Sequence, residues 1–494
     1  MGVIRRQSIQ TSILSYLGVG LGYINVVLLF PVFFEPEQFG LTRVLIAVIG
    51  VSAQFALFGM TNAIIRFFPR FREGDEDRHH GLLGLALFSG LIGIAIVAGI
   101  LVLAQPWIIS HYQEKSALVV QFYSLLFPFL LFEVCFQIFT SYTRALYHSV
   151  VNVFFRQVFL RVATLALILA YHFQLIDFSS FMLLFIGQFG LMALGLAVYL
   201  VYIGKFNLSL DRSFLTPSLK KDLIQYSSFT MLSSVGALFL MNIDVIMISS
   251  MIGLGDTAFY AVAFYIVALM NIPRNALSNI SIPVVSDAWK RNDHETIQKI
   301  YSKTSINQLL AGTLLFVGIW ANEANIFRIL PEAYGGGKWV LLFVGLARLV
   351  DVGFGVNGGI ITTSDWYKFD TYANLVLLVV TIVLNLIFIP VYGITGAAIA
   401  TAISLLSFNI AKYLFLKIKF NFGPFSWKSA VTLVLGAVSY YVSTFLSEQG
   451  SLIFDIVLRS AIIVIVFVPV ALLLNLSEDA TQFLRTLKNR FGNS

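Results

Sequence analysis

Cysteine is almost absent from this chain of 494 residues, in which Cys135 is the single example. One cysteine excludes an intramolecular disulfide and a zinc site built from several cysteines. Cys135 lies inside an apolar segment, where a thiol packs as a small apolar side chain. The six histidines are scattered over several loops without the spacing of metal ligands, which argues against a metal centre.

Charge is also scarce, because 12% of the residues are charged whereas 58% are hydrophobic. Soluble domains carry roughly 25% charged residues, and no soluble fold hides so much apolar surface. The net charge of +7 is spread over short loops between apolar runs rather than gathered in one patch. This distribution indicates membrane topology and gives no reason to expect a nucleic-acid partner.

Signatures of catalysis are missing as well. Gly335, Gly336, Gly337 and Lys338 look like the end of a phosphate-binding loop, but Trp339 stands where a Ser or Thr is required. No segment between apolar runs exceeds about 20 residues, which leaves no room for a soluble domain. We therefore expect a protein that is not an enzyme, binds no cofactor, and works within its membrane helices.

Long apolar runs fill the rest of the chain. A bilayer core of about 30 Å requires about 20 mainly apolar residues per helix, so the sequence predicts an all-α polytopic membrane protein with about fourteen transmembrane helices. We expect the first run to serve as an uncleaved targeting signal, with the mature protein beginning near Met1. The predicted spans lie near residues 8–33, 44–65, 82–104, 117–140, 149–171, 178–203, 225–252, 257–283, 304–327, 339–363, 371–390, 393–411, 429–447 and 453–475.

The distribution of Lys and Arg predicts the orientation of these spans. Of the 32 basic residues, 23 fall in segments assigned to the cytoplasm and four in segments assigned to the opposite face. Basic residues are enriched in cytoplasmic loops, so both termini are predicted to be cytoplasmic.

Fourteen spans suggest a division into six, six and two. The predicted parts are an N-terminal lobe at 1–204 with helices 1 to 6, a C-terminal lobe at 205–420 with helices 7 to 12, and two additional helices with a cytoplasmic tail at 421–494.

Ionisable residues inside the spans are the first functional candidates, because charge within a bilayer is costly and is usually kept for a purpose. Cations outnumber acids among them, which suits an anionic substrate in a water-filled cavity. The alternative is structural pairing: Arg348 and Asp351 share one helix face, and acids on neighbouring helices can neutralise the other arginines. The cations are Arg156, Arg161, Arg274 and Arg348, and the acids are Glu133, Asp244 and Asp351.

Span eight carries the richest polar group. Asn271, Arg274 and Asn275 surround Pro273, which predicts a kink with amide groups and a cation beside it. This group is either a cavity wall that moves or a set of hydrogen bonds between helices.

Two segments carry a family resemblance that covers the whole chain. One is the opening from Ile9 to Ala63 with its turn at Phe39 and Gly40, and the other is PVYGITGAAIAT at 390–401. With the fourteen-span layout, they resemble the Wzx-like polysaccharide flippases of the multidrug/oligosaccharidyl-lipid/polysaccharide exporter superfamily. The span-one arginines of the lipid II flippase branch are absent, as is the mid-span acid of ion-coupled drug exporters.

The resemblance implies two six-helix lobes around a central cavity that opens alternately to each face, with two additional helices. It also implies that the cargo is an undecaprenyl-diphosphate-linked oligosaccharide whose diphosphate is received by cavity cations. Arg274 stands where such relatives often place a cation of span eight. Candidate substrate-binding residues are Arg274, Arg348, Arg156, Arg161, Asn271, Asn275, Asp244 and Asp351.

We therefore expect a flippase that moves a polyprenyl-diphosphate-linked oligosaccharide across the bacterial cytoplasmic (inner) membrane, for a surface polysaccharide such as the O-antigen of lipopolysaccharide. Expected partners are this lipid-linked oligosaccharide, membrane lipid, and neighbouring polysaccharide polymerase and glycosyltransferase enzymes. Coupling to Na⁺ or H⁺ stays open. The alternatives are an ion-coupled multidrug exporter, which the excess of cations disfavours, and a membrane polymerase or glycosyltransferase, which the short outer loops disfavour.

Overall fold

The computed structural model describes residues 2–75, 77–209, 211, 213–446, 450–479 and 481–482. These residues form helices and no β-strand. They fall into two compact units, Met1–Ala261 and Val262–Ser494, each of which is described by itself below. Most of the predicted cytoplasmic tail, residues 483–494, lies outside the described residues. The predicted lobe limits at residues 204 and 420 were drawn by counting the predicted spans, and they stay predictions.

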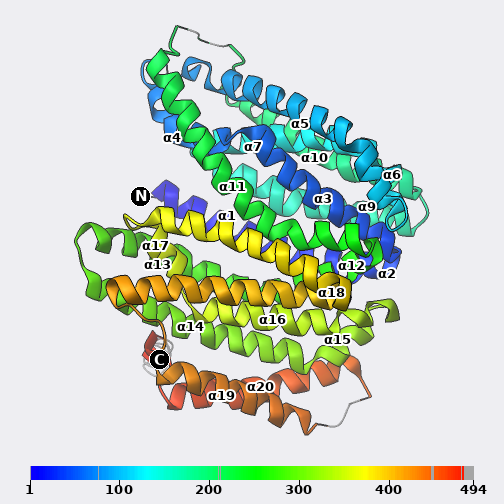
Figure 1. Ribbon diagram of the computed structural model, residues 1–494, viewed down its shortest axis with the longest axis vertical. Helices are drawn as coiled ribbons and strands as arrows, with labels where there is room; N and C mark the ends of the chain where they lie inside the picture. Colours follow the sequence, from blue (N-terminus) through cyan, green and yellow to red (C-terminus); the bar gives the residue numbers. More distant parts are fainter. Residues whose placement is uncertain are drawn as a thin grey trace. The chain divides into compact units, whose positions relative to one another are not determined.

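The first unit is a bundle in which α3, α5, α7 and α10 pack side by side, and α11 packs along α3 (Figure 1). Its helices are α1 Gly2–Tyr23, α2 Phe30–Phe33, α3 Pro36–Leu57, α4 Met60–Arg72, α5 Leu82–Tyr112, α6 Ala117–Gln121, α7 Leu126–Ala145, α8 Ser149–Val153, α9 Leu160–His172, α10 Phe178–Tyr202 and α11 Pro217–Met251; α12 Leu254–Val267 crosses the limit between the units.

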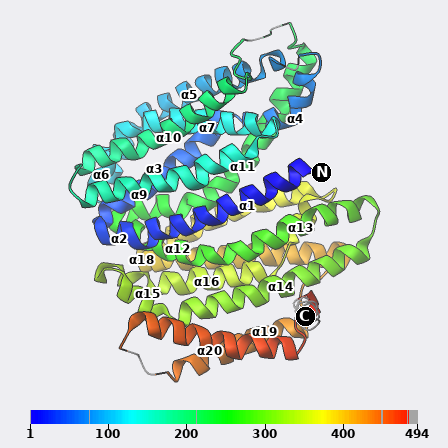
Figure 2. The same ribbon diagram turned by 180° about the vertical axis from the view of Figure 1, so that it is seen from behind.

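The second unit is built around α14 and α16, which pack on each other; α16 also packs on α18, and α14 packs on α19 (Figure 2). Its helices are α13 Asn271–Lys290, α14 His294–Ala321, α15 Glu323–Ile329, α16 Lys338–Gly353, α17 Asn357–Thr362, α18 Tyr367–Phe420, α19 Trp427–Thr444 and α20 Leu452–Leu473.

Each of the fourteen predicted spans overlaps a helical segment, but the span near 44–65 crosses the break between α3 and α4 at Phe58 and Gly59, and the span near 339–363 crosses the break between α16 and α17. By length and composition alone, the described residues contain ten helices that could cross a membrane, or eleven when the bent α11 is counted as one span. The number is lower than fourteen because α18 contains two predicted spans, α16 has only 16 residues, and α19 is comparatively polar. The predicted all-α membrane fold is confirmed.

The long helix α18 reverses direction near its middle. A straight helix of its 54 residues would be about 80 Å long, more than twice the thickness of a bilayer core. Gly393 interrupts it with φ 58° and ψ −139°, a conformation that favours glycine. Gly396 then lies so close to the backbone of Phe388 that a Cβ would overlap the Phe388 carbonyl. The predicted break between spans eleven and twelve is therefore present.

The last two helices, α19 and α20, lie side by side and pack on α14 (Figures 1 and 2). Leu435, Phe467 and Ala471 form their buried contact, against which Leu310 and Leu314 of α14 pack. These helices lie at the positions of the last two predicted spans.

Candidate functional site

One carboxylate in the second unit faces two arginines from different helices. Asp351 and Arg348 lie three residues apart on α16, and their Oδ2 and Nη1 atoms are 3.8 Å apart. Arg274 on α13 brings its Nη1 to 3.3 Å from the same Oδ2. The arginine of span eight thus meets the acid of span ten, a pairing that helix spacing alone does not predict.

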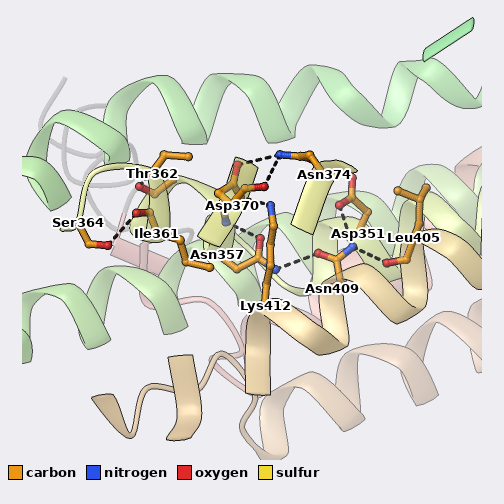
Figure 3. Close-up of polar contacts among 12 residues, drawn as sticks. Asp351, Asn357, Ile361, Thr362, Ser364, Asp370, Asn374, Leu405, Asn409 and Lys412 are labelled. Atoms are coloured by element: carbon orange, nitrogen blue, oxygen red, sulfur yellow. Dashed lines mark hydrogen bonds and ion pairs between the residues drawn. The ribbon is translucent and has the colours of Figure 1, made fainter. Parts of the chain in front are cut away.

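The second oxygen of Asp351 is held by a chain of buried amides. Asn409 donates to Asp351 Oδ1 at 3.1 Å, and Asn357 donates to Asn409 at 2.9 Å. Figure 3 shows Asn409 of α18 between the side chains of Asp351 and Asn357. We call Arg274, Arg348, Asp351, Asn409 and Asn357 the arginine cluster.

A second buried ion pair lies beside the arginine cluster. The ammonium of Lys412 is 2.5 Å from Asp370 Oδ1, and Asn374 donates to Asp370 Oδ2 at 2.9 Å (Figure 3). Lys412 also lies 4.0 Å from the centre of the Phe408 ring. The predicted span at 393–411 ends just before Lys412, whereas α18 continues to Phe420, so Lys412 lies within the helix and is buried.

Pro273 explains how Arg274 is presented. A proline has no N–H to donate to the carbonyl four residues earlier, here Leu269, and its ring crowds that carbonyl. The chain makes a 3₁₀ turn at Ala268–Met270, between α12 and α13, where this hydrogen bond would have formed. The helix thus changes locally to a 3₁₀ turn before Pro273, within a helical segment that runs from Leu254 to Lys290, and Arg274 follows Pro273 directly.

The two asparagines of span eight differ in their surroundings. Asn275 is exposed, whereas the Oδ1 atom of Asn271 is buried and accepts no hydrogen bond from the described residues. A buried acceptor without a donor is costly, and functional sites are one place where it is tolerated. Asn271 is therefore a candidate for contact with a ligand.

The first unit contains a different kind of charged cluster. Arg156 donates to Glu133 Oε2 at 3.1 Å, Gln137 donates to Glu133 Oε1 at 2.9 Å, and Gln54 donates to Gln137 at 2.8 Å. These contacts link the predicted spans two, four and five. Glu133 thus has one arginine partner and one amide partner.

Arg161 donates hydrogen bonds to the backbone of its own helical segment. Span five contains a π-helical turn at Phe154–Phe159, between α8 and α9. Arg161 Nη1 donates to the carbonyls of Arg156 and Gln157 at 2.9 and 3.1 Å. Its own carbonyl accepts a 2.8 Å hydrogen bond from Asn25, which lies in a second π-helical turn at Ile24–Leu29. These contacts give Arg161 a structural task.

Asp244 is buried on α11 and accepts a 2.5 Å hydrogen bond from the Tyr260 hydroxyl of α12. It thus joins two consecutive helices within the first unit.

Within the described residues, no group of three or more His, Cys, Asp or Glu side chains has the arrangement of a metal site. The guanidinium and amide donors of the arginine cluster are suited to recognition of an anion.

The residues that the sequence analysis missed are Asn357, Asp370, Asn409 and Lys412. The spacing of Asn409 and Lys412, three residues apart at the end of an otherwise apolar run, was the available signal. Lys412 and Asp370 were not recognised as candidates because they lie next to the ends of predicted spans, where charged side chains usually reach water.

The chain resembles known proteins in sequence and in fold. The model of the family described as polysaccharide biosynthesis proteins matches residues 4–289. A probable low-salt glycan biosynthesis flippase, Agl15, of Haloferax volcanii is 25% identical over 258 residues, which are 51% of this chain and 54% of Agl15. The match thus spans about half the length of this curated relative.

Solved structures show the same fold at low sequence identity. The lipid II flippase MurJ, in an inward closed conformation, aligns with a TM-score of 0.76 and 14% identity over 94% of this chain and 99% of MurJ. An inward-facing multidrug resistance MATE family transporter of the MOP superfamily aligns with a TM-score of 0.62 and 16% identity, over 83% of this chain and 94% of the transporter. Since the family model matches more than half of the sequence, the chain belongs to the polysaccharide biosynthesis protein family, and its fold is that of MurJ and the MATE transporters.

Proposed function

We propose that this protein is a flippase that moves a polyprenyl-diphosphate-linked oligosaccharide across the cytoplasmic membrane by alternating access. We propose that the protein transports its cargo and does not catalyse a reaction on it. The cargo is destined for a surface polysaccharide such as an O-antigen. Polysaccharide polymerase and glycosyltransferase enzymes are its proposed neighbours.

The observation that carries the proposal is the charge of the arginine cluster. Two guanidinium groups face one carboxylate oxygen, so the three side chains together bear a net positive charge inside a membrane fold. Charged side chains inside a membrane fold are expensive and are usually retained for a function. Guanidinium groups bind phosphate oxygens with directed hydrogen bonds, and a diphosphate offers several such oxygens.

The relatives support the same cargo class. Agl15 is described as a glycan biosynthesis flippase, and MurJ as a lipid II flippase. A polyprenyl tail can remain in the bilayer while the charged diphosphate passes through the protein, which needs only a polar path for the head group.

Export of cationic drugs is the rival function, because the MATE fold is also similar. A cationic drug would require acids in excess of cations, whereas Asp351 is outnumbered by arginines and Asp370 is paired with Lys412. The arginine cluster therefore favours an anionic cargo.

Depletion of the protein in its host tests the function directly. Radiolabelled polyprenyl-linked oligosaccharide should accumulate on the cytoplasmic leaflet while surface polymer disappears. Delivery of precursor that then stays unpolymerised would indicate an enzyme instead, and unchanged precursor and polymer would favour drug export.

The proposed orientation, with both termini in the cytoplasm, has its own test. Because Cys135 is the only cysteine, Cys135→Ser gives a cysteine-free background in which single cysteines are introduced into predicted loops. Loops rich in Lys and Arg should react with a membrane-impermeant maleimide only after the cells are opened. Labelling of those loops in intact cells would reverse the orientation.

A further inference from the structure

We propose that Asp351 is an internal counter-anion, which occupies Arg274 and Arg348 between transport cycles and which the phosphate groups of the cargo must displace. This inference rests on the proposed function and adds a positioning residue to it. Asp351 would make cargo binding weaker and cargo release faster.

The ion pairs of Asp351 have the geometry of contacts that can exchange. The two N–O distances are 3.3 and 3.8 Å, whereas charge-assisted hydrogen bonds usually measure about 2.7–2.9 Å. Both arginines approach Oδ2 of Asp351, so their contacts with this carboxylate are not the two-pronged kind in which one guanidinium binds both oxygens. The side chain of Arg274 keeps 34% of its surface exposed, which leaves it accessible to a ligand.

A buried arginine elsewhere in the second unit shows what a permanent contact looks like. Arg459 Nε is 2.6 Å from Asp455 Oδ2, and its other nitrogens donate to the carbonyls of Ser443 and Leu446. Its side chain is only 12% exposed. The same pair of residue types is therefore built tightly at α20 and loosely at the arginine cluster.

A hydrogen bond holds the carboxylate of Asp351, whereas the side chain of Arg274 is the more exposed of its two arginine partners. Asn409 holds the other oxygen of Asp351, and Asn357 holds Asn409 in turn. All three side chains are less than a tenth exposed. An arriving phosphate would thus draw a long arginine side chain away while Asp351 stays in place.

This arrangement solves a problem of every carrier that binds an anion inside a membrane. Two arginines without an anion would be costly in a low dielectric, and arginines too well matched to the cargo would retain it. A carboxylate that returns to the arginines lowers the free energy of the empty state and so promotes release.

The test uses the full-length protein in nanodiscs and geranyl-diphosphate-linked N-acetylglucosamine as a soluble probe. We expect Asp351→Asn to tighten probe binding about tenfold, because the competing charge is removed, and to lower the maximal transport rate in proteoliposomes. Asp455→Asn is the matched control, since it changes a buried Asp–Arg pair far along the chain, and its probe affinity should equal that of the wild type. Arg274→Ala should weaken binding at least tenfold.

The outcomes separate this inference from the proposed function. If Arg274→Ala weakens binding but Asp351→Asn leaves it unchanged or weaker, the counter-anion role is overturned and the cargo site stands. If Arg274→Ala binds the probe like the wild type, the cargo site itself is wrong.

If Asp351→Asn does not fold, a second comparison tests the same role, with a double variant in which one cation and one anion are removed together. Arg348→Gln alone is compared with Arg348→Gln/Asp351→Asn, which removes one cation and the acid together. The double variant should bind the probe about tenfold more tightly than the single one. Equal affinities would overturn the role of Asp351, and a merely structural role would alter stability without this gain in affinity.

Discussion

The charged clusters of the two units use the same residue types in different proportions. In the first unit, Glu133 has one arginine on one oxygen and one glutamine on the other, so charge and hydrogen bonds balance locally. In the second unit, a single oxygen of Asp351 faces two arginines. Local balance is typical of a structural contact, and surplus charge is typical of a site that awaits a partner.

The same contrast holds for the breaks in the helices. The π-helical turn of span five is closed by Arg161, which donates to the carbonyls of that turn. The break before α13 is caused by Pro273 and leaves a buried acceptor on Asn271. The π-helical turn of span five is thus hydrogen-bonded from within the chain, whereas the Oδ1 atom of Asn271 accepts no hydrogen bond from the described residues.

The largest effect is expected from removing a cation of the second unit. Arg274→Ala should lower transport about tenfold to hundredfold, since a hydrogen bond to a charged group contributes about 1.5–3 kcal/mol. The matched change in the first unit, Arg156→Ala, should lower it less than Arg274→Ala does. The measurement is restoration of surface polysaccharide in a flippase-deficient strain, with membrane levels checked by blotting. Equal losses for the two variants would remove the distinction between the units.

Stability should respond in the opposite order. Glu133→Gln leaves Arg156 without its carboxylate, and we expect a loss of about 1–2 kcal/mol, below the full cost of breaking a buried pair because Arg156 is partly exposed. Thermal unfolding of the purified protein in detergent measures this loss. Transport per folded molecule should change little, and a folded Glu133→Gln protein without transport would make the first cluster a second site.

Replacing Pro273 should affect stability and transport in different directions. Pro273→Ala restores a donor for the Leu269 carbonyl, so the free energy of unfolding should be unchanged or rise by up to about 1 kcal/mol. Transport should fall several-fold, because Arg274 would be presented differently. Unchanged transport would show that the 3₁₀ turn at Ala268–Met270 has no part in positioning the arginine.

The smallest effect is expected in a loop outside both clusters. Hydrogen bonds from Ser213, from His80 and from the Phe214 backbone lower the pKa of Asp211 to about 2. Because this pKa is depressed, the stabilising contact is complete above the ordinary aspartate pKa of about 3.9 and is lost as the pH falls through 2. Pepsin should therefore cut this loop slowly near pH 4 and faster near pH 2.

Asp211→Asn provides the comparison for that experiment. In this variant, pepsin should cut the loop rapidly both near pH 4 and near pH 2. In Asp177→Asn, a variant at the start of α10, pepsin should cut the loop as it does in the wild type. Identical pH profiles for Asp211→Asn and the wild type would show that the carboxylate does not hold the loop.

The fold followed from the sequence because the bilayer imposes one dominant rule on it. Apolar runs of about 20 residues locate helices, and the Pro390 and Gly393 pair predicts the reversal in α18 without further information. The end of one span differs from its prediction: the span at 393–411 stops before Lys412, whereas α18 continues to Phe420 and Lys412 forms an ion pair with Asp370.

The sequence predicted only part of the candidate site. Arg274, Arg348 and Asp351 were recognised because charge is rare within spans, yet their meeting depends on how α13 and α16 pack, which has no local signal. Asn357 and Asn409 were missed because asparagine is common at helix interfaces and only its neighbours give it a role. Arg156 and Arg161 met the same criterion as Arg274, and only their contacts distinguish them.

The most direct test of the account is movement of the cargo across a bilayer that contains only this protein. Proteoliposomes carrying a fluorescent polyprenyl-diphosphate-linked oligosaccharide are mixed with a membrane-impermeant quencher, and the protected fraction is followed over time. The account predicts that the wild type exposes the inner-leaflet pool, that Arg156→Ala retains most of this activity, and that Arg274→Ala exposes the pool about tenfold to hundredfold more slowly than the wild type. A protected fraction that the wild type leaves unchanged, or that Arg274→Ala exposes at the wild-type rate, would contradict it.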